Sequence, residues 1–379
     1  MKLIVDENIT CGKEAFSKFG EVHLHPGREI SNEIVKDADA LIVRSITNVN
    51  EELLKNSNVK FVGTATIGFD HIDTNYLASQ KIGFTTAAGC NSYAVAEYVM
   101  SSLAYLIKNN NFSLEGKSIG IVGHGNIGKI IEQYSKALGL KIVLNDPPLK
   151  RKTVESKYKS LEEALECDII TLHVPLNKNG IDKTVHLINE KNLNLIKSGS
   201  VLINSCRGPV VDNQILKARL TEKKDLLTVF DVWENEPFAD LEFLQSTNIS
   251  TAHIAGYSYE GKINGTKIIF DKLNSFLKTE YKWQPPLPKL ENPELKINSS
   301  SADQFLTEVF NQTYQVEKDS NQLKETKSDS PKGFAKAFDL IRKNYPFRRE
   351  LLNYYVRSSV EGENSDLLKS FRIKQIPGE

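Results

Sequence analysis

The chain has 379 residues, which is long enough for two or three domains with sizeable buried cores. Lysine plus arginine number 48, and so do aspartate plus glutamate, so the formal net charge is zero. This balance argues against nucleic acid or an anionic membrane surface as the main partner, although a local basic pocket for a small anion remains compatible with it.

The cysteines and the N-terminal residues indicate the compartment. The four cysteines are far apart and show neither CxxC nor zinc-finger spacing, so we expect free thiols in a reducing environment and no bound metal. The first residues, "MKLIVDENIT", lack the apolar core of a signal peptide, and no apolar run reaches the length of a membrane span. We therefore expect a soluble, cytoplasmic protein.

The first part of the chain alternates short apolar runs with helical patterns, which predicts a parallel α/β sheet. The candidate strands are "KLIV", "EVHLH", "ALIVRS", "KFVGTAT" and "KIGFTTA". Residues 92–109 then place apolar side chains at helical spacing without glycine or proline, so we expect one long helix that leads into a second domain.

A second strand–helix alternation occupies residues 93–255. Its candidate strands are "KSIGIVG", "KIVLND", "DIITLHVP", "SVLINS", "LTVFDVW" and "NISTAHI". Residues 256–281 predict a helix that returns to the first domain. The chain is therefore expected to be α/β, with two Rossmann-like parallel-sheet domains: one of residues 1–92 and 256–281, and one of residues 93–255 inserted in it. A cleft between them is the expected substrate site.

The last part of the chain follows a proline-rich break, "KWQPPLPKL". Residues 286–379 predict a small domain with about two amphipathic helices, one of them in "FAKAFDLIRKNY". The polar stretch between them, "EKDSNQLKETKSDSPKG", predicts an exposed loop. Because this region carries no chemical motif of its own, we expect it to mediate self-association.

A glycine-rich turn marks the start of the second domain. In "SIGIVGHGNIGKIIEQYSKALGLKIVLND" the pattern GxGxxG follows an apolar strand and opens a helix, and the next strand ends at Asp146, 18 residues after Gly128. This context predicts a dinucleotide site, although an α/β turn that needs glycines only for its backbone is the alternative. The residues concerned are Gly123, Gly125, Asn126, Ile127, Gly128 and Asp146.

Each of these glycines has an expected role. Gly123 allows the tight turn, Gly125 lets a pyrophosphate approach the helix N-terminus, and Gly128 permits close helix–strand packing. Asp146 can accept hydrogen bonds from both ribose hydroxyls, and its negative charge would repel a 2′-phosphate, so NAD is favoured over NADP. We expect His124, inside the turn, to be a spectator.

Three polar residues follow later strands of the same domain: Arg207, Glu236 and His253. Any one of them alone is typical of a surface ion pair, a solvated carboxylate or a surface histidine. Together behind a cofactor turn they suit the oxidation of a 2-hydroxy acid. Arg207 would bind the carboxylate and polarise the 2-oxygen, His253 would take the hydroxyl proton, and Glu236 would hold the histidine ring.

These motifs give the chain a resemblance to the D-isomer specific 2-hydroxyacid dehydrogenases over roughly residues 1–280. The matching segments, in order, are "NSYAVAEYVM", "VGHGNIG", "HVPL" followed by Thr184, "INSCRGPVVD", "DVWENEP" and "HIAG". Ordered matches are far more specific than any single motif. The family implies Arg207, Glu236 and His253 as catalytic residues, with His253 as the acid/base.

Within the family, five segments resemble the branch that acts on a phosphorylated four-carbon acid: "VDENI", "ADALIVRSITNVNEELL", "KFVGTATIGFDHID", "GCNSYAVAEYV" and "HIAGYSYEGKINGT". This resemblance implies NAD-linked oxidation of 4-phospho-D-erythronate to 2-oxo-3-hydroxy-4-phosphobutanoate in pyridoxal phosphate biosynthesis. It also implies a homodimer, with residues 286–379 as an α+β dimerisation domain. Residues 93–255 would be the NAD-binding domain, and residues 1–92 with 256–281 the substrate-binding domain.

The same resemblance implies further contacts. The substrate contacts would be Ser45, Thr66 and Tyr257, and the additional cofactor contacts Val174, Cys206, Arg207, Gly208, Asp231 and Gly256. Val174 is a departure, because that branch usually has a threonine there, so only its backbone could serve. For the phosphate we consider Arg44, for which an ion-pair or helix-cap role is the alternative, and Arg348 or Arg349 reaching across a dimer interface.

Two alternative functions remain open from the sequence. One is another dehydrogenase of the family, acting on phosphoglycerate, glycerate or lactate. Phosphoglycerate dehydrogenases with extensions tend to carry a small-molecule-sensing βαββαβ domain, which the C-terminal pattern here does not resemble. The other alternative is an NAD-sensing interaction protein that keeps the same fold.

Overall fold

The computed structural model describes residues 1–328, 330–357 and 364–378. By their internal contacts these residues form two compact units. Unit 1 comprises Met1–Asn91 and Ser258–Lys289, and unit 2 comprises Ser92–Tyr257 and the described residues from Leu290 onward. The further division into three domains, with a boundary near residue 286, stays a prediction.

Unit 1 is built on a five-stranded parallel sheet in the order β2-β1-β3-β4-β5. The strands are β1 (Lys2–Asp6), β2 (Glu21–His25), β3 (Ala40–Val43), β4 (Phe61–Thr64) and β5 (Gly83–Thr86). They confirm the predicted strands. The helices are α1 (Gly12–Phe16), α2 (Asn32–Val35), α3 (Glu51–Leu54), α4 (Thr74–Ser79) and α11 (Tyr259–Leu277), with a 3-10 turn η1 (Gly27–Glu29).

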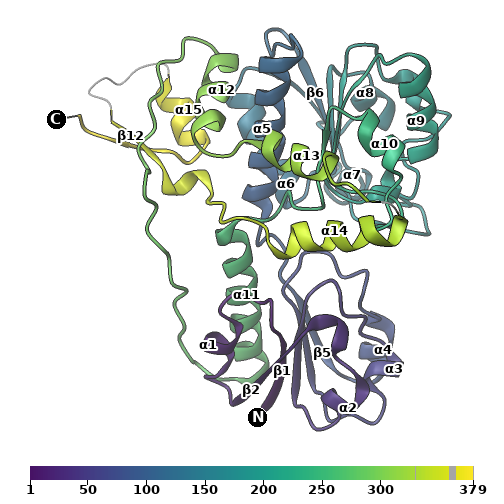
Figure 1. Ribbon diagram of the computed structural model, residues 1–379, viewed down its shortest axis with the longest axis vertical. Helices are drawn as coiled ribbons and strands as arrows, with labels where there is room; N and C mark the ends of the chain where they lie inside the picture. Colours follow the sequence, from purple (N-terminus) through teal and green to yellow (C-terminus); the bar gives the residue numbers. More distant parts are fainter. Residues whose placement is uncertain (329, 358–363, 379) are drawn as a thin grey trace. The chain divides into compact units, whose positions relative to one another are not determined.

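Both faces of this sheet are covered. Helices α1 and α11 supply Phe16, Ile263 and Phe270 to the core on one face, and α11 runs beside β4 and β5 (Figure 1). Helices α2, α3 and α4 close the other face. Such two-sided cover explains why β3 reads as a continuous apolar run rather than as an alternating one.

Unit 2 is built on a six-stranded parallel sheet in the order β11-β10-β9-β8-β6-β7. The strands are β6 (Ser118–Val122), β7 (Lys141–Asn145), β8 (Ile169–Leu172), β9 (Val201–Asn204), β10 (Leu227–Phe230) and β11 (Ile249–Ser250). The helices along it are α5 (Ser92–Asn109), α6 (Asn126–Ala137), α7 (Pro147–Thr153), α8 (Leu161–Leu165), α9 (Asn213–Glu222) and α10 (Leu241–Ser246), with 3-10 turns η2 (Leu193–Leu195) and η3 (Gly208–Val210).

The side chains of β9 show how the two faces of this sheet are filled. Val201 and Ile203 enter the core that α5 and α6 cover, whereas Leu202 enters the core on the opposite face. The six predicted strands and the long helix at 92–109 are confirmed, and so is the parallel α/β fold class.

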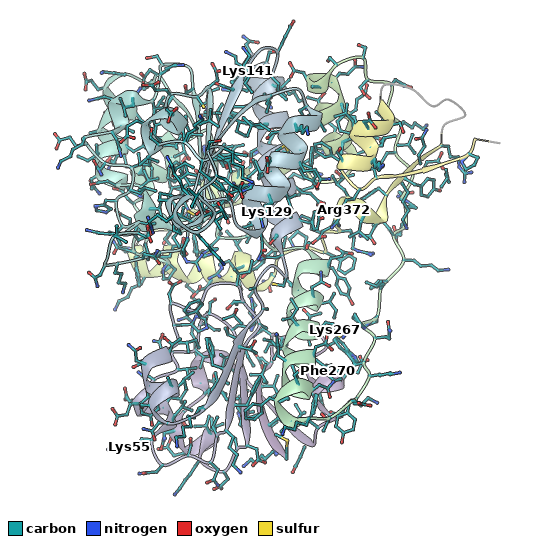
Figure 2. All side chains as sticks on the ribbon, turned by 180° about the vertical axis from the view of Figure 1, so that it is seen from behind. Lys55, Lys129, Lys141, Lys267, Phe270 and Arg372 are labelled. Atoms are coloured by element: carbon teal, nitrogen blue, oxygen red, sulfur yellow. The ribbon has the colours of Figure 1, made fainter. Side chains whose placement is uncertain are left out.

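The C-terminal segment belongs to unit 2 and packs against α5, α6 and β11. Its helices are α12 (Ala302–Gln312), α13 (Val316–Lys324), α14 (Pro331–Lys343) and α15 (Asn364–Ser370), and its strands β12 (Tyr355–Arg357) and β13 (Lys374–Ile376) pair in parallel beyond a 3-10 turn η4 (Leu351–Asn353). Arg372, labelled in Figure 2, ties this segment to α5, since its guanidinium lies 3.4 Å from the Tyr93 ring centroid and 3.0 Å from Glu350.

The predicted exposed loop "EKDSNQLKETKSDSPKG" is wrong in its first half, because α13 forms there. The buried side chains of α13 include Val316, Ser320 and Leu323, which recur at helical spacing and face β11 and α5. The Ser320 hydroxyl accepts a hydrogen bond from the Ser250 backbone N–H at 3.1 Å. Tertiary packing therefore stabilises a helix whose composition is polar.

Among the described residues, no helix combines the length and the apolar composition that a membrane crossing requires.

Candidate active site

The predicted site residues of unit 2 gather at one edge of its sheet. They follow the strands in turn: Gly123 after β6, Asp146 after β7, Val174 after β8, Arg207 after β9, Asp231 after β10 and His253 after β11. Because all six strands are parallel, their carboxyl ends meet at the same edge. The strand order reverses beside β6, which pairs with both β7 and β8, and such a switch point forms a crevice for ligands.

The glycine turn after β6 is shaped by close backbone approaches. Gly123 has a φ of +94°, and a Cβ there would lie 2.5 Å from the His173 carbonyl oxygen. A Cβ on Gly128 would lie 2.1 Å from the Gly123 oxygen. At Gly125, in contrast, a Cβ would meet no protein atom within 4 Å. The fold thus requires the first and third glycines, whereas the second leaves open space at the start of α6.

The N-terminus of α6 is not closed by a side chain. Its N-cap is Gly125, which makes no capping hydrogen bond. The following helices of the sheet are capped by their own side chains, namely α7 by Asp146, α8 by Ser160, α9 by Asp212 and α10 by Asp240. Unpaired N–H groups at a helix start attract phosphate, so this turn fits the pyrophosphate of a dinucleotide.

Asp146 has a second role that the sequence analysis missed. Its Oδ2 accepts the His124 backbone N–H at 2.8 Å, and its Oδ1 accepts the Leu149 N–H at 2.9 Å, which caps α7. The carboxylate therefore fixes the glycine turn to the end of β7, and each oxygen keeps a lone pair for a ribose hydroxyl. The His124 ring is bound by Glu132 and Tyr158, at 2.7 and 3.1 Å, in agreement with a structural role.

The turn after β9 carries three of the predicted cofactor contacts, Cys206, Arg207 and Gly208. The Cys206 backbone N–H donates to Asn204 Oδ1 at 3.2 Å, and burial raises the pKa of its thiol to about 11, so the thiol stays protonated. A Cβ on Gly208 would lie 2.0 Å from the carbonyl of Trp233, so only glycine fits there.

Arg207 begins this turn in an extended conformation. Its Nη1 donates to the Cys206 carbonyl at 2.7 Å, and its own carbonyl accepts from Asn204 Nδ2 at 3.0 Å. The side chain is half-buried. These contacts hold a guanidinium at the end of β9, the strand that pairs with β10.

His253 and Glu236 form a tight pair. His253 Nδ1 lies 2.7 Å from Glu236 Oε2, while Glu236 Oε1 accepts the Trp233 backbone N–H at 2.7 Å. Burial by itself raises the pKa of Glu236, but the charge and hydrogen bond of His253 and the Trp233 N–H outweigh it, so the net pKa is lowered. The ionised carboxylate engages Nδ1, which leaves Nε2 as the nitrogen able to exchange a proton with a substrate.

Asp231 organises the turn that carries this histidine. Its carbonyl accepts the His253 N–H at 2.7 Å. Its Oδ1 accepts the Thr251 hydroxyl at 2.6 Å and the Ile254 N–H at 2.8 Å, and its Oδ2 accepts the Ala255 N–H at 2.9 Å. His253 itself has a left-handed φ of 55°, a conformation that costs roughly 1–3 kcal/mol outside glycine and persists only where neighbouring groups impose it.

From the sequence, Asp231 is expected only to contact the cofactor, as is Gly256, which lies three residues after His253. The fold makes Asp231 a buried anchor, 1% exposed, and burial raises the pKa of its carboxyl. The signal in the sequence was an aspartate directly after the apolar run of β10. The partners that give it this role lie 20 to 24 residues later, beyond the range of a local pattern.

Comparison with known proteins finds similar sequences over nearly the whole chain. Residues 96–255 match the family described as D-isomer specific 2-hydroxyacid dehydrogenase, NAD binding domain. The chain is also 42% identical over 379 residues to erythronate-4-phosphate dehydrogenase of Klebsiella pneumoniae, with 99% of both chains covered. It is 43% identical over 374 residues to the protein of that name from Hahella chejuensis, with 97% of both covered.

The chain belongs to the D-isomer specific 2-hydroxyacid dehydrogenase family.

Solved structures of this dehydrogenase family share the fold. The NAD⁺-bound 3-phosphoglycerate dehydrogenase of Entamoeba histolytica matches with a TM-score of 0.63 and 27% identity over 73% of this chain and 95% of that chain. The D-lactate dehydrogenase of Aquifex aeolicus, complexed with NAD and lactic acid, matches with a TM-score of 0.60 and 27% identity over 73% and 96%. Residues 286–371 match a separate family described as a domain of unknown function (DUF3410).

Two of the three substrate contacts that the resemblance implies lie in unit 1 of this dehydrogenase. Ser45 follows β3 and Thr66 follows β4, and these strands are neighbours, so both residues stand at the carboxyl edge of the sheet. Ser45 is exposed, and the Thr66 hydroxyl donates to the Gly68 carbonyl at 2.9 Å. The third residue, Tyr257, belongs to unit 2, where its ring packs edge-on against Tyr345 at 5.6 Å.

The hypothesis that Arg348 or Arg349 reaches a phosphate on another subunit is wrong. Both are buried within their own chain, at 7% and 5% exposure. Arg348 Nη2 donates to the carbonyls of Ala94 and Ala255, and its guanidinium lies 4.2 Å from the Tyr314 ring centroid. It therefore anchors the C-terminal segment to the turn after His253.

Proposed function

We propose that this chain oxidises 4-phospho-D-erythronate to 2-oxo-3-hydroxy-4-phosphobutanoate with NAD. The observation that carries the proposal is the Glu236–His253 pair, held at the sheet edge that also carries the glycine turn. The 42–43% identity to proteins named erythronate-4-phosphate dehydrogenase, over nearly the full length of both chains, supports the choice of substrate.

Each of these side chains has a separate role in the proposed reaction. NAD, when bound, accepts the hydride that leaves C2 of the hydroxy acid. Arg207 binds the substrate carboxylate as a fork and polarises the C2 oxygen. His253 Nε2 takes the hydroxyl proton as the C2 oxygen becomes a carbonyl, and Glu236 stabilises the imidazolium that forms. Asp231 keeps the imidazole in place by holding its backbone turn.

The cofactor contacts follow from the same sheet edge. The turn of Gly123, Gly125, Asn126, Ile127 and Gly128 would hold the pyrophosphate, and Asp146 the adenosine ribose. The backbone of Val174, the Cys206–Gly208 turn, Asp231 and Gly256 would line the remaining length of the dinucleotide. Ser45, Thr66 and Tyr257 would contact the substrate.

The physiological setting is part of the proposal. We place the reaction in pyridoxal phosphate biosynthesis, in the cytoplasm, and we propose a homodimer formed through residues 286–379. Light scattering on the full chain tests the assembly, with a mass of twice 42.6 kDa expected. A mass of one chain at micromolar concentration would contradict it.

A substrate panel tests the proposed reaction. NADH formation is followed with 4-phospho-D-erythronate, 3-phosphoglycerate, glycerate and lactate at equal concentrations. We expect kcat/KM for the first to exceed that for glycerate and lactate by about 100-fold, because a site built for a phosphate rejects substrates that leave its polar groups unpaired. 3-Phosphoglycerate carries a phosphate but is one carbon shorter, so its kcat/KM should also be lower than that of 4-phospho-D-erythronate. A preference for 3-phosphoglycerate would assign the chain to another activity of the family, and NAD binding without turnover would indicate a sensor.

A further inference from the structure

One arginine outside the predicted trio stands beside the catalytic pair. Arg342, on α14, has its guanidinium carbon 5.9 Å from the Tyr257 ring centroid. Its positive charge also acts on Glu236, whose pKa it helps to lower. Arg342 thus connects α14 with both a proposed substrate contact and the carboxylate that holds His253.

The donors of Arg342 are only partly satisfied within the chain. Its side chain is 17% exposed, and its Nε is buried without a hydrogen-bond partner among the described residues. The nearest ion-pair contact is Nη1 to Asp339, one turn back on α14, at 4.0 Å, which is the limit for an ion pair. A buried donor left without a partner is costly, and in native proteins such donors are often completed by a ligand.

Glu236 does not complete the arginine. Its oxygens accept from the Trp233 N–H and from His253, and among the described residues no ion pair within 4 Å joins either oxygen to Arg342. Arg342 therefore lies beside the catalytic carboxylate without a bidentate ion pair to it. A second anion next to Tyr257 would satisfy the guanidinium and balance its charge.

The proposed substrate has two anionic ends. Arg207 is assigned to the carboxylate, so no cation of unit 2 has yet been assigned to the phosphate. A planar guanidinium with a phenol hydroxyl beside it suits phosphate oxygens, which accept forked hydrogen bonds. We propose that Arg342, together with Tyr257, binds the substrate phosphate, an assignment that rests on the proposed function.

This assignment gives the C-terminal segment a part in substrate choice. Arg342 lies within residues 286–371, the segment that matches a domain of unknown function. Its helix begins at Pro331 with a Ser330 cap and packs Phe334 and Phe338 into the core of unit 2. The arginine is therefore carried on a well-anchored helix rather than on a free tail.

The test compares two substrates in three variants of the full chain. Arg342→Gln removes the charge, Arg342→Lys keeps the charge without the fork, and Lys343→Ala removes an exposed charge from the end of the same helix as a matched control. For each, kcat and KM are measured with 4-phospho-D-erythronate and with D-erythronate, which lacks the phosphate. NAD affinity and the melting temperature report whether the variant is folded.

We expect Arg342→Gln to lower kcat/KM for the phosphorylated acid by about 10- to 100-fold, with little change for D-erythronate, since a hydrogen bond to a charged group has been lost. Most of the loss should be in KM, and millimolar guanidinium should restore part of it. Arg342→Lys should lie between wild type and Arg342→Gln, and Lys343→Ala should match wild type.

Equal losses on both substrates would overturn the inference and leave Arg342 as a structural support of Tyr257 and Glu236. If Arg342→Gln does not fold, the folded Arg342→Lys variant is used instead. An unchanged ratio of kcat/KM for 4-phospho-D-erythronate to kcat/KM for D-erythronate in that variant overturns the inference. Failure of the proposed function would be seen separately, as absence of turnover of 4-phospho-D-erythronate by the wild-type enzyme.

Discussion

The two parallel sheets share one architecture but end their first strands differently. In unit 1, β1 ends at Asp6, a fully buried carboxylate whose Oδ1 accepts the Asn8 N–H at 2.8 Å, and the helix that follows has five residues. In unit 2, β6 is followed by Gly123 and by Gly125, which opens a twelve-residue helix without a side-chain cap. The turn after β1 is occupied by the Asp6 carboxylate, whereas the turn after β6 has open space at Gly125 in which a phosphate could bind.

The fold alone therefore does not make the site. Both sheets could in principle present their carboxyl edge to a ligand, but the residues at the strand ends decide which ligand and which chemistry. Unit 1 also contains a histidine–glutamate pair, His23 with Glu21 at 3.2 Å, but it lies on strand β2 and its carboxylate is 76% exposed. The Glu236–His253 pair of unit 2 is half-buried and lies beyond a strand end.

Replacing the histidine of each pair should change kcat very differently. We expect His253→Asn to lower kcat by about 10³- to 10⁴-fold, because the base that takes the hydroxyl proton is lost. NAD affinity, measured by fluorescence titration, should stay within a few-fold, since the glycine turn is on another strand. His23→Asn in unit 1 is the matched control and should leave kcat unchanged. A kcat for His253→Asn near the wild-type value would exclude His253 as the base.

Glu236→Gln should lower kcat by about 100-fold, since the imidazole loses the charge that stabilises its protonated form. The folded pKa of Glu236 is depressed, so the stability it contributes is fully present above its ordinary value near 4.5 and is lost as pH falls through the lower folded value. The difference in unfolding free energy between wild type and Glu236→Gln should therefore shrink as the pH falls below about 4. A difference that grows on acidification would contradict this sign.

Two alanine substitutions distinguish the glycine needed for NAD binding from the glycine needed for packing. Gly125→Ala should raise the Kd for NAD by about tenfold or more with an unchanged melting temperature, because its Cβ meets only the space that the pyrophosphate would enter. Gly128→Ala should cost about 1–3 kcal/mol of stability, because its Cβ would overlap the Gly123 oxygen. Calorimetry and NAD titration on both variants check the contrast, and equal effects on both would remove the distinction.

The smallest expected effect is in unit 1. Ser45→Ala should raise KM for the phosphorylated acid about three- to tenfold, the range of one hydrogen bond, and leave NAD affinity unchanged. Ser79→Ala, at the exposed end of α4, is the control and should have no effect. An unchanged KM in Ser45→Ala would remove this residue from the proposed substrate contacts.

Local sequence patterns were sufficient for most of the fold. The strands of both sheets, the long helix α5 and the glycine turn with Asp146 could all be predicted, because each depends on neighbours within one strand or helix. The position of Arg207, Glu236 and His253 at one sheet edge could be predicted as well, since residues that follow parallel strands reach the same edge, while their catalytic roles stay a prediction.

The remainder depended on residues far apart in the chain. Helix α13 is stabilised by packing against β11, where the Ser250–Ser320 hydrogen bond joins residues 70 positions apart. Arg348, expected to face another subunit, is bound by Ala94, 254 positions away. Such contacts cannot be predicted from local patterns, because the residues next to either partner in the sequence do not depend on the contact.

The residue pattern alone predicts a parallel α/β protein with a dinucleotide turn and with an arginine, a glutamate and a histidine after successive strands. Long-range packing, in contrast, makes Asp231 hold the left-handed turn of His253 and brings Arg342 next to the Tyr257 ring. The physical reason is range: backbone propensity and hydrophobic periodicity act over a few residues, whereas the partners of a buried charge are chosen by how whole elements pack.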